Sequence, residues 1–420
     1  MREMKDSGVE WIGEIPKDKA LLRNKYSFFF EKGKIPGSTN TEGIGQPYIG
    51  ASDLDSNTGY SVYTEDEEIP TAKGNDLLVL WDGARAGICG THLEGAISST
   101  IVKVSSDATI CQSFLYWYYK GFEWYMLQCV MGTTIPHMSR EYIEQIGIIN
   151  WPIDEQHRIA DYLDAKCTQI DRAIARQQEV IEKLKEYKLS VITEAVTKGL
   201  NPDVPMKDSG IEWIGEIPEG WEIRKIRWDF SVDLGKMLDA KQISGQYLGD
   251  YLRNTDVQWN SINFENLPQM DFQENESERY QIRAGDLLVC EGGEIGRCAI
   301  VPEDFQPPIF YQKALHRVRT RKMGNGNVSF LAYVLFCMSK NQYFFNSPEK
   351  ATIAHLPAET LNRLRIPSPT QQEQIEISQF LDIECGKIDK ITQRKQQLID
   401  KLTEYKKSLI YEAVTGKREV

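Results

Sequence analysis

The sequence predicts an α+β protein built as a tandem pseudo-repeat, in which two α+β inserts are joined and spaced by two long antiparallel coiled-coil helices. Two observations support this fold class. A short motif recurs after 202 residues, and a longer segment with heptad spacing of apolar residues recurs after 218 residues. The regions between these matches share only fragments and differ in length by 218 − 202 = 16 residues.

The short motif begins each half of the chain. Residues 4–16 read MKDSGVEWIGEIP, and residues 206–218 repeat them with one change, Val9 to Ile211. The longer segment covers residues 165–199 and returns as residues 383–417, closing both times on Glu-Ala-Val-Thr. A near-constant frame that carries two dissimilar inserts indicates two sites that do the same kind of job on different targets.

The longer segment predicts two long helices that pair with each other. Its apolar residues are three and four positions apart, and no Pro or Gly interrupts residues 165–198 before the stop signal of Gly199 and Pro202. The predicted helix-pairing seam consists of Ile170, Val180, Leu184, Tyr187 and Val191 with Ile388, Leu398, Leu402, Tyr405 and Leu409. Packing of each helix on its own insert is the alternative. At about 1.5 Å per residue such a helix measures roughly 50 Å, or one to two turns of duplex DNA.

The inserts, residues 22–151 and 221–369, have an α+β pattern of short apolar runs between Gly-rich turns. Each insert also holds an aromatic helix-like stretch, at residues 114–130 and 330–345. We interpret these aromatic residues as core rather than as a platform for stacking bases.

Composition fits a globular protein, with 41% hydrophobic and 26% charged residues in 420. The 49 basic and 61 acidic residues give a net charge of −12, which by itself argues against a nucleic-acid partner, because phosphate neutralisation needs Lys and Arg. The position of the positive residues matters more than the average. Without a secretory signal, a membrane span or a Cys-x-x-Cys pair, we expect a cytoplasmic, reduced protein.

The sequence offers no catalytic or metal-binding constellation. It contains no phosphate-binding Gly-x-x-x-x-Gly-Lys loop, no dinucleotide fingerprint, no methyltransferase Asn/Asp-Pro-Pro-Phe/Tyr motif and no histidine pairs at ligand spacing. His137 and His355 hold equivalent positions, but we interpret them as structural residues in a turn. Two divergent halves without a shared catalytic set favour binding over catalysis.

Turn residues of the inserts supply the side-chain types that contact base edges and phosphates. The predicted DNA-binding residues of the first insert are Lys32, Lys34, Thr39, Asn40, Gln46, Arg85, Ser98, Ser99 and Lys103. Those of the second are Lys236, Lys241, Gln242, Arg253, Asn254, Arg297, Tyr311, Gln312, Lys313 and Arg317.

The duplicated Ser-Gly-x-Glu-Trp-Ile-Gly-Glu-Ile-Pro motif and the duplicated helix from Ile-Asp to Glu-Ala-Val-Thr resemble the specificity subunit of type I restriction-modification systems. The ends of the inserts, residues 149–156 and 366–374, resemble it as well. The likeness covers essentially the whole chain. One departure concerns the family's Pro-x-x-Trp, which is present at Pro218–Trp221 but reads Pro16-Lys17-Asp18-Lys19 in the first copy, so we expect different packing there.

The resemblance implies a non-catalytic DNA-recognition subunit in which two target recognition domains each read half of a split, asymmetric duplex DNA target. It implies a motif and first recognition domain at 1–152, a spacer helix at 153–200, a linker at 201–220, a second recognition domain at 221–369 and a second spacer helix at 370–420. The helices would set the spacer and dock two methyltransferase (M) subunits with S-adenosylmethionine; restriction (R) subunits would bring ATP/Mg. This chain itself would hold no cofactor or metal.

Two other classes of function remain open from the residues alone. One is a coiled-coil scaffold that joins protein partners without recognising DNA, and the other is an undetected methyltransferase or nuclease. An exchange of residues 22–151 separates the first alternative from the favoured function, because only a DNA reader would change half of a recognised sequence.

Overall fold

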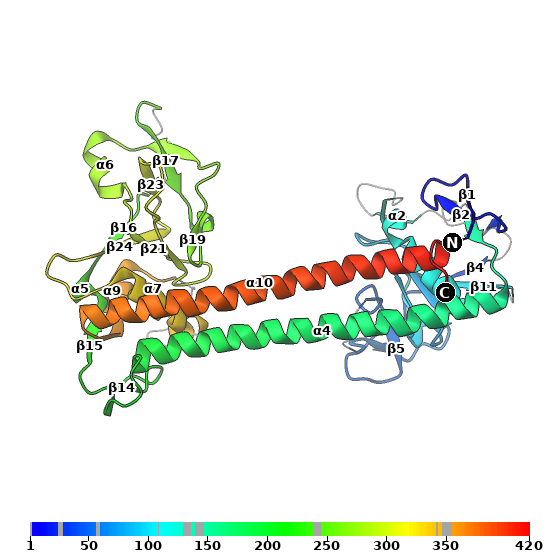
Figure 1. The fold of residues 1–420 in the computed structure, drawn as a ribbon, viewed down its shortest axis with the longest axis horizontal. Helices are drawn as coiled ribbons and strands as arrows, with labels where there is room; N and C mark the ends of the chain where they lie inside the picture. Colours follow the sequence, from blue (N-terminus) through cyan, green and yellow to red (C-terminus); the bar gives the residue numbers. More distant parts are fainter. Residues whose placement is uncertain are drawn as a thin grey trace. The chain divides into compact units, whose positions relative to one another are not determined.

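The computed structural model describes residues 2–23, 28–55, 59–107, 109–128, 136–138, 147–237, 245–341, 343–346 and 355–420. The chain divides into two compact units, of which unit 1 comprises residues 1–179 and 395–420 and unit 2 comprises residues 180–394. Two long helices, α4 (Ile153–Lys198) and α10 (Gln371–Thr415), contribute residues to both units (Figure 1). Each unit therefore contains one insert and one segment of each long helix.

The repeated motif forms the same β-hairpin in both units. β1 (Met4–Asp6) pairs with β2 (Glu14–Pro16), and β13 (Met206–Asp208) pairs with β14 (Glu216–Pro218) in identical antiparallel register. In unit 1, Ile12 and Ile15 of this motif pack into the core that holds the last turns of α10. In unit 2, the equivalent Ile214 and Ile217 pack against the last turns of α4. The hairpin thus covers the C-terminal end of a long helix in each unit.

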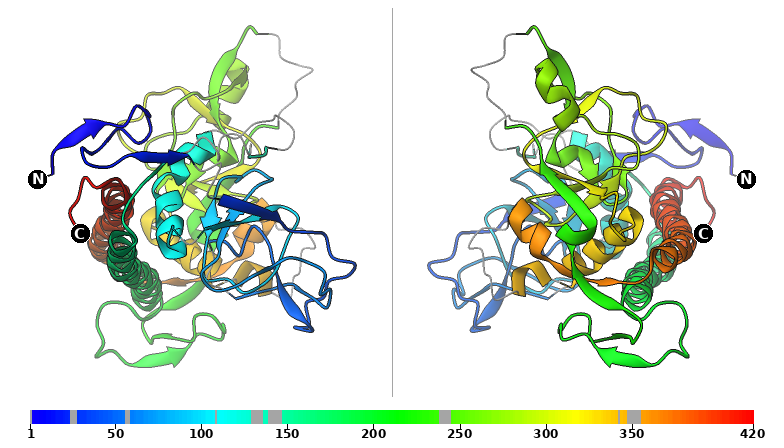
Figure 2. Two further views of the ribbon diagram at one scale, coloured as in Figure 1. Left: turned by 90° about the vertical axis from the view of Figure 1, so that its right-hand side faces the viewer. Right: turned by 90° about the vertical axis from the view of Figure 1, so that its left-hand side faces the viewer.

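The predicted antiparallel pairing of the two long helices is confirmed within each unit, where α4 and α10 lie side by side (Figures 1 and 2). In unit 1, the Lys406 ammonium lies 2.7 Å from the Asp171 carboxylate. In unit 2, the Lys188 ammonium lies 2.7 Å from the Asp389 carboxylate. The two ion pairs join equivalent residues, since Asp171 and Asp389, like Lys188 and Lys406, are 218 positions apart.

Three residues of the predicted seam are less buried than a seam position requires. Tyr187, Tyr405 and Leu398 are 58%, 48% and 41% exposed. The physical reason is that an α-helix has 3.6 residues per turn and drifts by about 20° per heptad from a seven-residue pattern. Of the other seam residues, the structure buries Ile170, Ile388 and Leu409 and half-buries Val180, Leu184, Val191 and Leu402.

The insert of unit 1 contains two small sheets and a helical layer. The antiparallel sheet has the order β4 (Phe28–Lys32), β11 (Ile101–Ser106), β8 (Leu77–Leu80) and β9 (Cys89–Gly90). The mixed sheet has the order β6 (Tyr63–Thr64), β5 (Gln46–Ile49), β10 (Gly95–Ile97) and β7 (Thr71–Ala72). Helices α1 (Gln112–Gly121) and α2 (Glu123–Gln128) follow, and β3 (Leu21–Arg23) pairs with β12 (Gly147–Ile149) at the base.

The insert of unit 2 repeats this topology. Its antiparallel sheet has the order β16 (Phe230–Leu234), β24 (Leu315–Thr320), β21 (Leu287–Cys290) and β22 (Cys298–Ile300). The second sheet has the order β20 (Gln269–Asp271), β17 (Leu248–Leu252) and β23 (Ile309–Tyr311), and β15 (Glu222–Lys225) pairs with β25 (Arg365–Ser368) at the base. The remaining elements are α5 (Ile226–Asp229), α6 (Glu274–Tyr280), α7 (Val328–Lys340), α8 (Tyr343–Asn346), α9 (Ala358–Arg363), β18 (Val257–Gln258) and β19 (Ser261–Ile262).

The aromatic stretches form core, as predicted. Phe114 and Tyr118 on α1 and Phe330 on α7 are buried in the main hydrophobic clusters of their units. The two inserts are therefore more alike in fold than in sequence, because burial of apolar strand and helix faces fixes the topology while the exposed positions vary. Among the residues that the structure describes, no helix has the length and the apolar character needed to cross a membrane.

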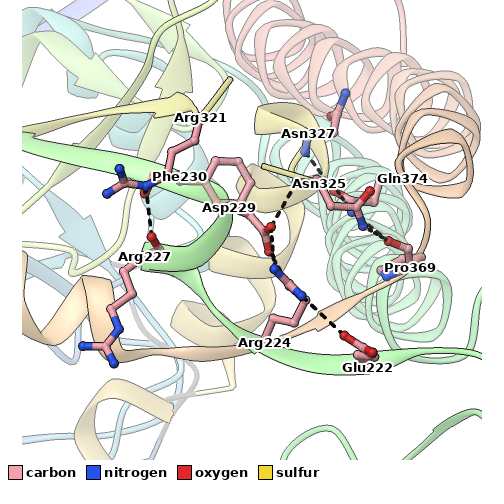
Figure 3. A network of polar contacts seen from close by, with 10 residues as sticks. All are labelled: Glu222, Arg224, Arg227, Asp229, Phe230, Arg321, Asn325, Asn327, Pro369 and Gln374. Atoms are coloured by element: carbon pink, nitrogen blue, oxygen red, sulfur yellow. Dashed lines mark hydrogen bonds and ion pairs between the residues drawn. The ribbon is translucent and has the colours of Figure 1, made fainter. Parts of the chain in front are cut away.

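A buried glutamine near the start of each long helix fixes the insert on the frame. In unit 2, the Gln374 side chain accepts a hydrogen bond from the Asn327 backbone N–H (2.8 Å) and donates to the carbonyls of Asn325 (2.8 Å) and Pro369 (3.0 Å) (Figure 3). In unit 1, Gln156 accepts from the Cys111 N–H (2.8 Å) and donates to the Thr109 and Trp151 carbonyls. Both side chains are 3% exposed. The equivalent contacts give the two inserts the same attachment.

The attachment in unit 2 is extended by a buried carboxylate. Asp229 receives a two-bond contact from Arg224, at 3.0 and 3.2 Å, and a hydrogen bond from the Asn325 backbone N–H (Figure 3). The hydrogen bond to Asp229 raises the pKa of Arg224. This network ties β15 and α5 to the loop that precedes α7.

Candidate nucleic-acid interface

Several turns of unit 1 meet at one edge of its insert, which we call turn face 1 and define as residues 32–34, 81–82, 98–100 and 137. The backbone N–H of Gly33 donates to the Ile101 carbonyl (3.0 Å), and that of Asp82 donates to the Thr100 carbonyl (3.3 Å). Asp82 also forms an isolated β-bridge with His137. A Cβ atom at Gly33 would lie 2.1 Å from the Ile97 carbonyl oxygen, so this close approach requires glycine.

Turn face 2 of unit 2, defined as residues 234–236, 291–292, 312–314 and 355, has the same construction. Gly235 donates to the Leu315 carbonyl (3.1 Å), and a Cβ atom there would lie 2.2 Å from the Gln312 carbonyl oxygen. The Glu291 N–H donates to the Ala314 carbonyl (3.0 Å), and Gly292 forms the isolated β-bridge with His355. The two inserts therefore bring equivalent turns together.

The structure gathers part of the predicted residues of insert 1 in turn face 1, namely Lys32, Lys34, Ser98 and Ser99. The others lie outside it: Arg85 pairs with Asp55 (2.6 Å) and Lys103 with Glu31 (2.6 Å), while Asn40 and Gln46 bond backbone groups of neighbouring loops and Thr39 is exposed.

In insert 2, turn face 2 contains Lys236, Gln312 and Lys313. Arg253 pairs with Asp256 (2.8 Å), and this hydrogen bond raises the pKa of Arg253. Arg297 donates to the backbone carbonyl (2.9 Å) and the side-chain oxygen (2.8 Å) of Asn254. Lys241 and Gln242 lie outside the described residues.

Three predicted DNA contacts are wrong because the side chains are buried. Ser98, Tyr311 and Arg317 are 6%, 0% and 4% exposed. The Arg317 guanidinium lies 3.0 Å from the Asp233 carboxylate and donates to the Arg279 and Gln281 carbonyls (2.8 and 2.9 Å). These residues stabilise the insert. The sequence shows only that they are polar, and their burial in the folded structure is what distinguishes them from residues that could contact DNA.

Ion pairs neutralise much of the positive charge that the sequence places near the turn faces. The Lys32 ammonium lies 2.8 Å from the Asp82 carboxylate, and Lys236 pairs with Glu276. Desolvation alone would raise the pKa of Glu276, but the hydrogen bond from Lys236 lowers it. The turn faces are therefore polar surfaces that present donors and acceptors rather than strongly cationic patches.

Two classes of residue at these faces were not predicted from the sequence. Trp81 and its equivalent Glu291 fix the histidine segments, because their carbonyls accept hydrogen bonds from the backbone N–H groups of Met138 (2.8 Å) and Leu356 (2.7 Å). Tyr48 donates from its hydroxyl to the Lys34 carbonyl (3.1 Å), and burial raises its pKa. Only the 218-residue match of His137 with His355 signalled these contacts in the sequence.

Within the described residues, no group of three or more His, Cys, Asp or Glu side chains could hold a metal ion.

Comparisons with known proteins identify a family. A family model described as "Type I restriction modification DNA specificity domain" matches residues 22–186 and 218–401. The chain is 26% identical, over 97% of its length and 94% of the relative, to the type I restriction enzyme MjaVIII specificity subunit of Methanocaldococcus jannaschii. It is 22% identical, over 86% of its length and 75% of the relative, to the EcoBI specificity subunit of Escherichia coli.

Solved structures share the fold. One is a chain from a structure that describes complex assembly and conformational transition of the type I R-M system. It aligns with a TM-score of 0.71 at 14% identity, covering 95% of this chain and 98% of that one. The HsdS subunit from Thermoanaerobacter tengcongensis aligns with a TM-score of 0.51 at 14% identity, covering 96% and 98%.

Proposed function

Because the chain belongs to the type I restriction-modification DNA specificity family, which makes it a non-catalytic DNA specificity subunit, we propose that each unit reads one half of a split, asymmetric duplex target. In this proposal turn face 1 contacts one half-site and turn face 2 contacts the other. The two half-sites differ in sequence because the inserts differ at their exposed positions.

One observation carries the proposal: the same backbone construction presents different side chains in the two units. Strand register makes Lys32 equivalent to Leu234, since β4 and β16 pair in the same way with β11 and β24. By the same register, Ser99 of unit 1 is equivalent to Lys313 of unit 2, and Asp82 is equivalent to Gly292. Side chains that read base edges must differ between two targets, whereas the backbone that supports them need not.

Partner subunits supply the chemistry in this proposal. The family places the chain in a restriction-modification complex, and we propose that two methyltransferase subunits dock on the long helices and bring S-adenosylmethionine. Restriction subunits would bring ATP/Mg. The net charge of −12 supports a division of labour in which partners make many of the phosphate contacts. The isolated chain should then bind its target more weakly than the whole complex, with a shallower salt dependence.

Exchange of residues 22–151 for the corresponding segment of another specificity subunit tests the division into half-sites. Detection of methylated adenines by long-read sequencing, in cells with the complete system, gives the motif before and after the exchange. We expect one half-site to change and the other half-site to stay. A motif that changes in both halves, or a complex that leaves no methylation motif at all, would contradict the proposal.

The long helices are proposed to set the spacer. Insertion of four residues between 173 and 191 of α4, with a matched insertion between 391 and 409 of α10, keeps the antiparallel pairing possible. Four helical residues add about 6 Å, so the spacer should lengthen by about two base pairs while both half-sites stay the same. A methylation motif with an unchanged spacer would remove the helices from this role.

A further inference from the structure

We propose that His137 and His355 are equivalent phosphate-contact residues, each of which donates a hydrogen bond from its imidazole to the DNA backbone of its half-site. This inference rests on the proposed function and adds to it a contact that is independent of DNA sequence. It replaces the interpretation of these histidines as purely structural turn residues.

The backbone holds both histidines in the same way. Each forms an isolated β-bridge with the turn after an equivalent strand, His137 with Asp82 after β8 and His355 with Gly292 after β21. The next residue is a buried anchor in both units, because Met138 and Leu356 are 1% and 2% exposed. The two imidazoles are therefore presented from the same place on each insert.

Both side chains are accessible to a ligand. Both histidines are exposed, and neither imidazole forms a hydrogen bond with any residue that the structure describes. A structural histidine would use its ring to satisfy a neighbour, as His316 does with the Leu356 carbonyl at 2.7 Å. Within the part of the chain that the structure describes, no contact of this kind accounts for the exposure of the two equivalent rings.

Comparison of the units indicates what the histidines contact. Their neighbours on the turn faces differ: Asp82 corresponds to Gly292, and Trp81 corresponds to Glu291. Lys34 and Lys236 hold equivalent positions but have different partners: Lys34 donates to the Glu68 carbonyl, whereas Lys236 is engaged by Glu276 and the Asp271 carbonyl. A side chain that stays constant among changing neighbours fits the part of DNA that is constant in any target, which is the phosphate backbone.

The test uses the complete complex and two duplex DNAs, one with its methylation motif and one with a scrambled sequence. His137→Ala and His355→Ala should each weaken binding about two- to tenfold, as expected for one hydrogen bond, and by the same factor for both DNAs. The methylation motif should stay unchanged. His137→Gln and His355→Gln retain a side-chain donor and should recover part of the affinity.

His92→Asn is a matched control, because His92 is an exposed histidine of insert 1 outside turn face 1, and asparagine tolerates its left-handed backbone conformation (φ of 58°). It should leave DNA affinity unchanged. Unaltered affinity of both alanine variants would overturn the proposal, and so would a change in one half of the motif, which would indicate a base contact. Loss of complex assembly in size-exclusion chromatography would assign the histidines to a protein interface instead. Failure of the unmutated complex to bind its motif would reject the proposed function rather than this inference.

Discussion

The C-terminal ends of the two long helices are built alike but are covered by tryptophans from different parts of the chain. Gly199 after α4 and Gly416 after α10 both have φ of +76°, the left-handed conformation that ends many helices. A Cβ atom at Gly199 would lie 3.1 Å from the Trp221 ring, and one at Gly416 would lie 2.7 Å from the Trp151 ring. The two units thus fill the same position from two different segments.

The two tryptophans are not equivalent in the repeat. Trp221 closes the Pro-x-x-Trp that follows β14, where unit 1 has Lys19. Trp151 precedes α4, and its equivalent in unit 2 is Pro369. The equivalence follows from the buried glutamines, since Gln156 donates to the Trp151 carbonyl (2.8 Å) and Gln374 donates to the Pro369 carbonyl (3.0 Å). The departure from the family motif in the first copy is therefore compensated. Both units therefore keep a tryptophan ring packed over the end of the helix, although the tryptophan comes from a different sequence position in each unit.

The largest expected effect is removal of either tryptophan. Trp151→Ala and Trp221→Ala should each lower the free energy of unfolding by about 3–5 kcal/mol, because both rings are buried and truncation leaves a cavity. Urea unfolding of the full chain measures the loss. If Trp151→Ala costs less than about 1 kcal/mol, the ring does not have the packing role that its burial indicates.

A double variant tests the compensation directly. Lys19→Trp with Trp151→Pro gives unit 1 the arrangement of unit 2 and should recover a substantial part of the stability that Trp151→Pro loses alone. The Lys19 ammonium lies 5.2 Å from the centre of the Trp151 ring, so the two positions are close enough to couple. Purely additive effects of the two substitutions would show that the helix end can be covered only in the native way.

The next effect concerns the buried glutamines, at which the two units are the same. Gln156→Leu and Gln374→Leu each leave a buried backbone N–H without its acceptor and remove two hydrogen bonds to backbone carbonyls, so each should lower the free energy of unfolding by about 1–3 kcal/mol. Similar losses in urea unfolding are expected for both variants. Gln178→Leu, at an exposed position of α4, is the control and should change stability little. Clearly unequal losses would mean that the inserts are attached differently.

The stability of unit 2 should depend on pH through the buried His316, which has no counterpart in unit 1. His316 on β24 pairs with Val289, and the same register in unit 1 makes Val102 the equivalent residue. Burial lowers the pKa of His316, against the opposing effects of the Leu356 carbonyl and Glu291. The folded state thus prefers the neutral ring. Its contribution to stability is complete above the unfolded pKa of about 6.5 and is lost as the pH falls toward the lower folded pKa, by up to about 1.4 kcal/mol per pH unit.

Unfolding of His316→Val between pH 7 and pH 5 measures this term, because the substitution gives unit 2 the residue type of unit 1. The variant should lose less stability than the parent chain over this range. Identical pH dependence of variant and parent would show that His316 does not titrate on unfolding.

The smallest effect is expected at the equivalent ion pairs of the long helices. Lys406→Ala and Lys188→Ala should each change the free energy of unfolding by less than about 1 kcal/mol, because both Asp171 and Asp389 are largely exposed. Double-mutant cycles with Asp171→Ala and Asp389→Ala isolate the pair energies, which should fall at high salt. A coupling well above 1 kcal/mol in one unit alone would break the equivalence of the two pairs.

The sequence was sufficient for the frame of the molecule, because near-identical segments must form the same local structure. The repeated motif gave the same hairpin twice, and the uninterrupted periodic segments gave α4 and α10. The site was predicted less well. Lys32, Lys34 and Lys313 are exposed on the turn faces. Ser98 in its turn and Tyr311 and Arg317 on their strands are buried, since a polar residue type carries no information about whether its side chain faces the core.

By itself, the sequence determined that the chain is a duplicated frame with two different inserts, because repeats and long periodic segments are local properties of the chain. Only the tertiary structure decided which residues meet. Trp151 covers Gly416, and His137 meets Asp82, through contacts between segments far apart in sequence. Such contacts depend on volume and backbone geometry, which different residues at different positions can satisfy equally well.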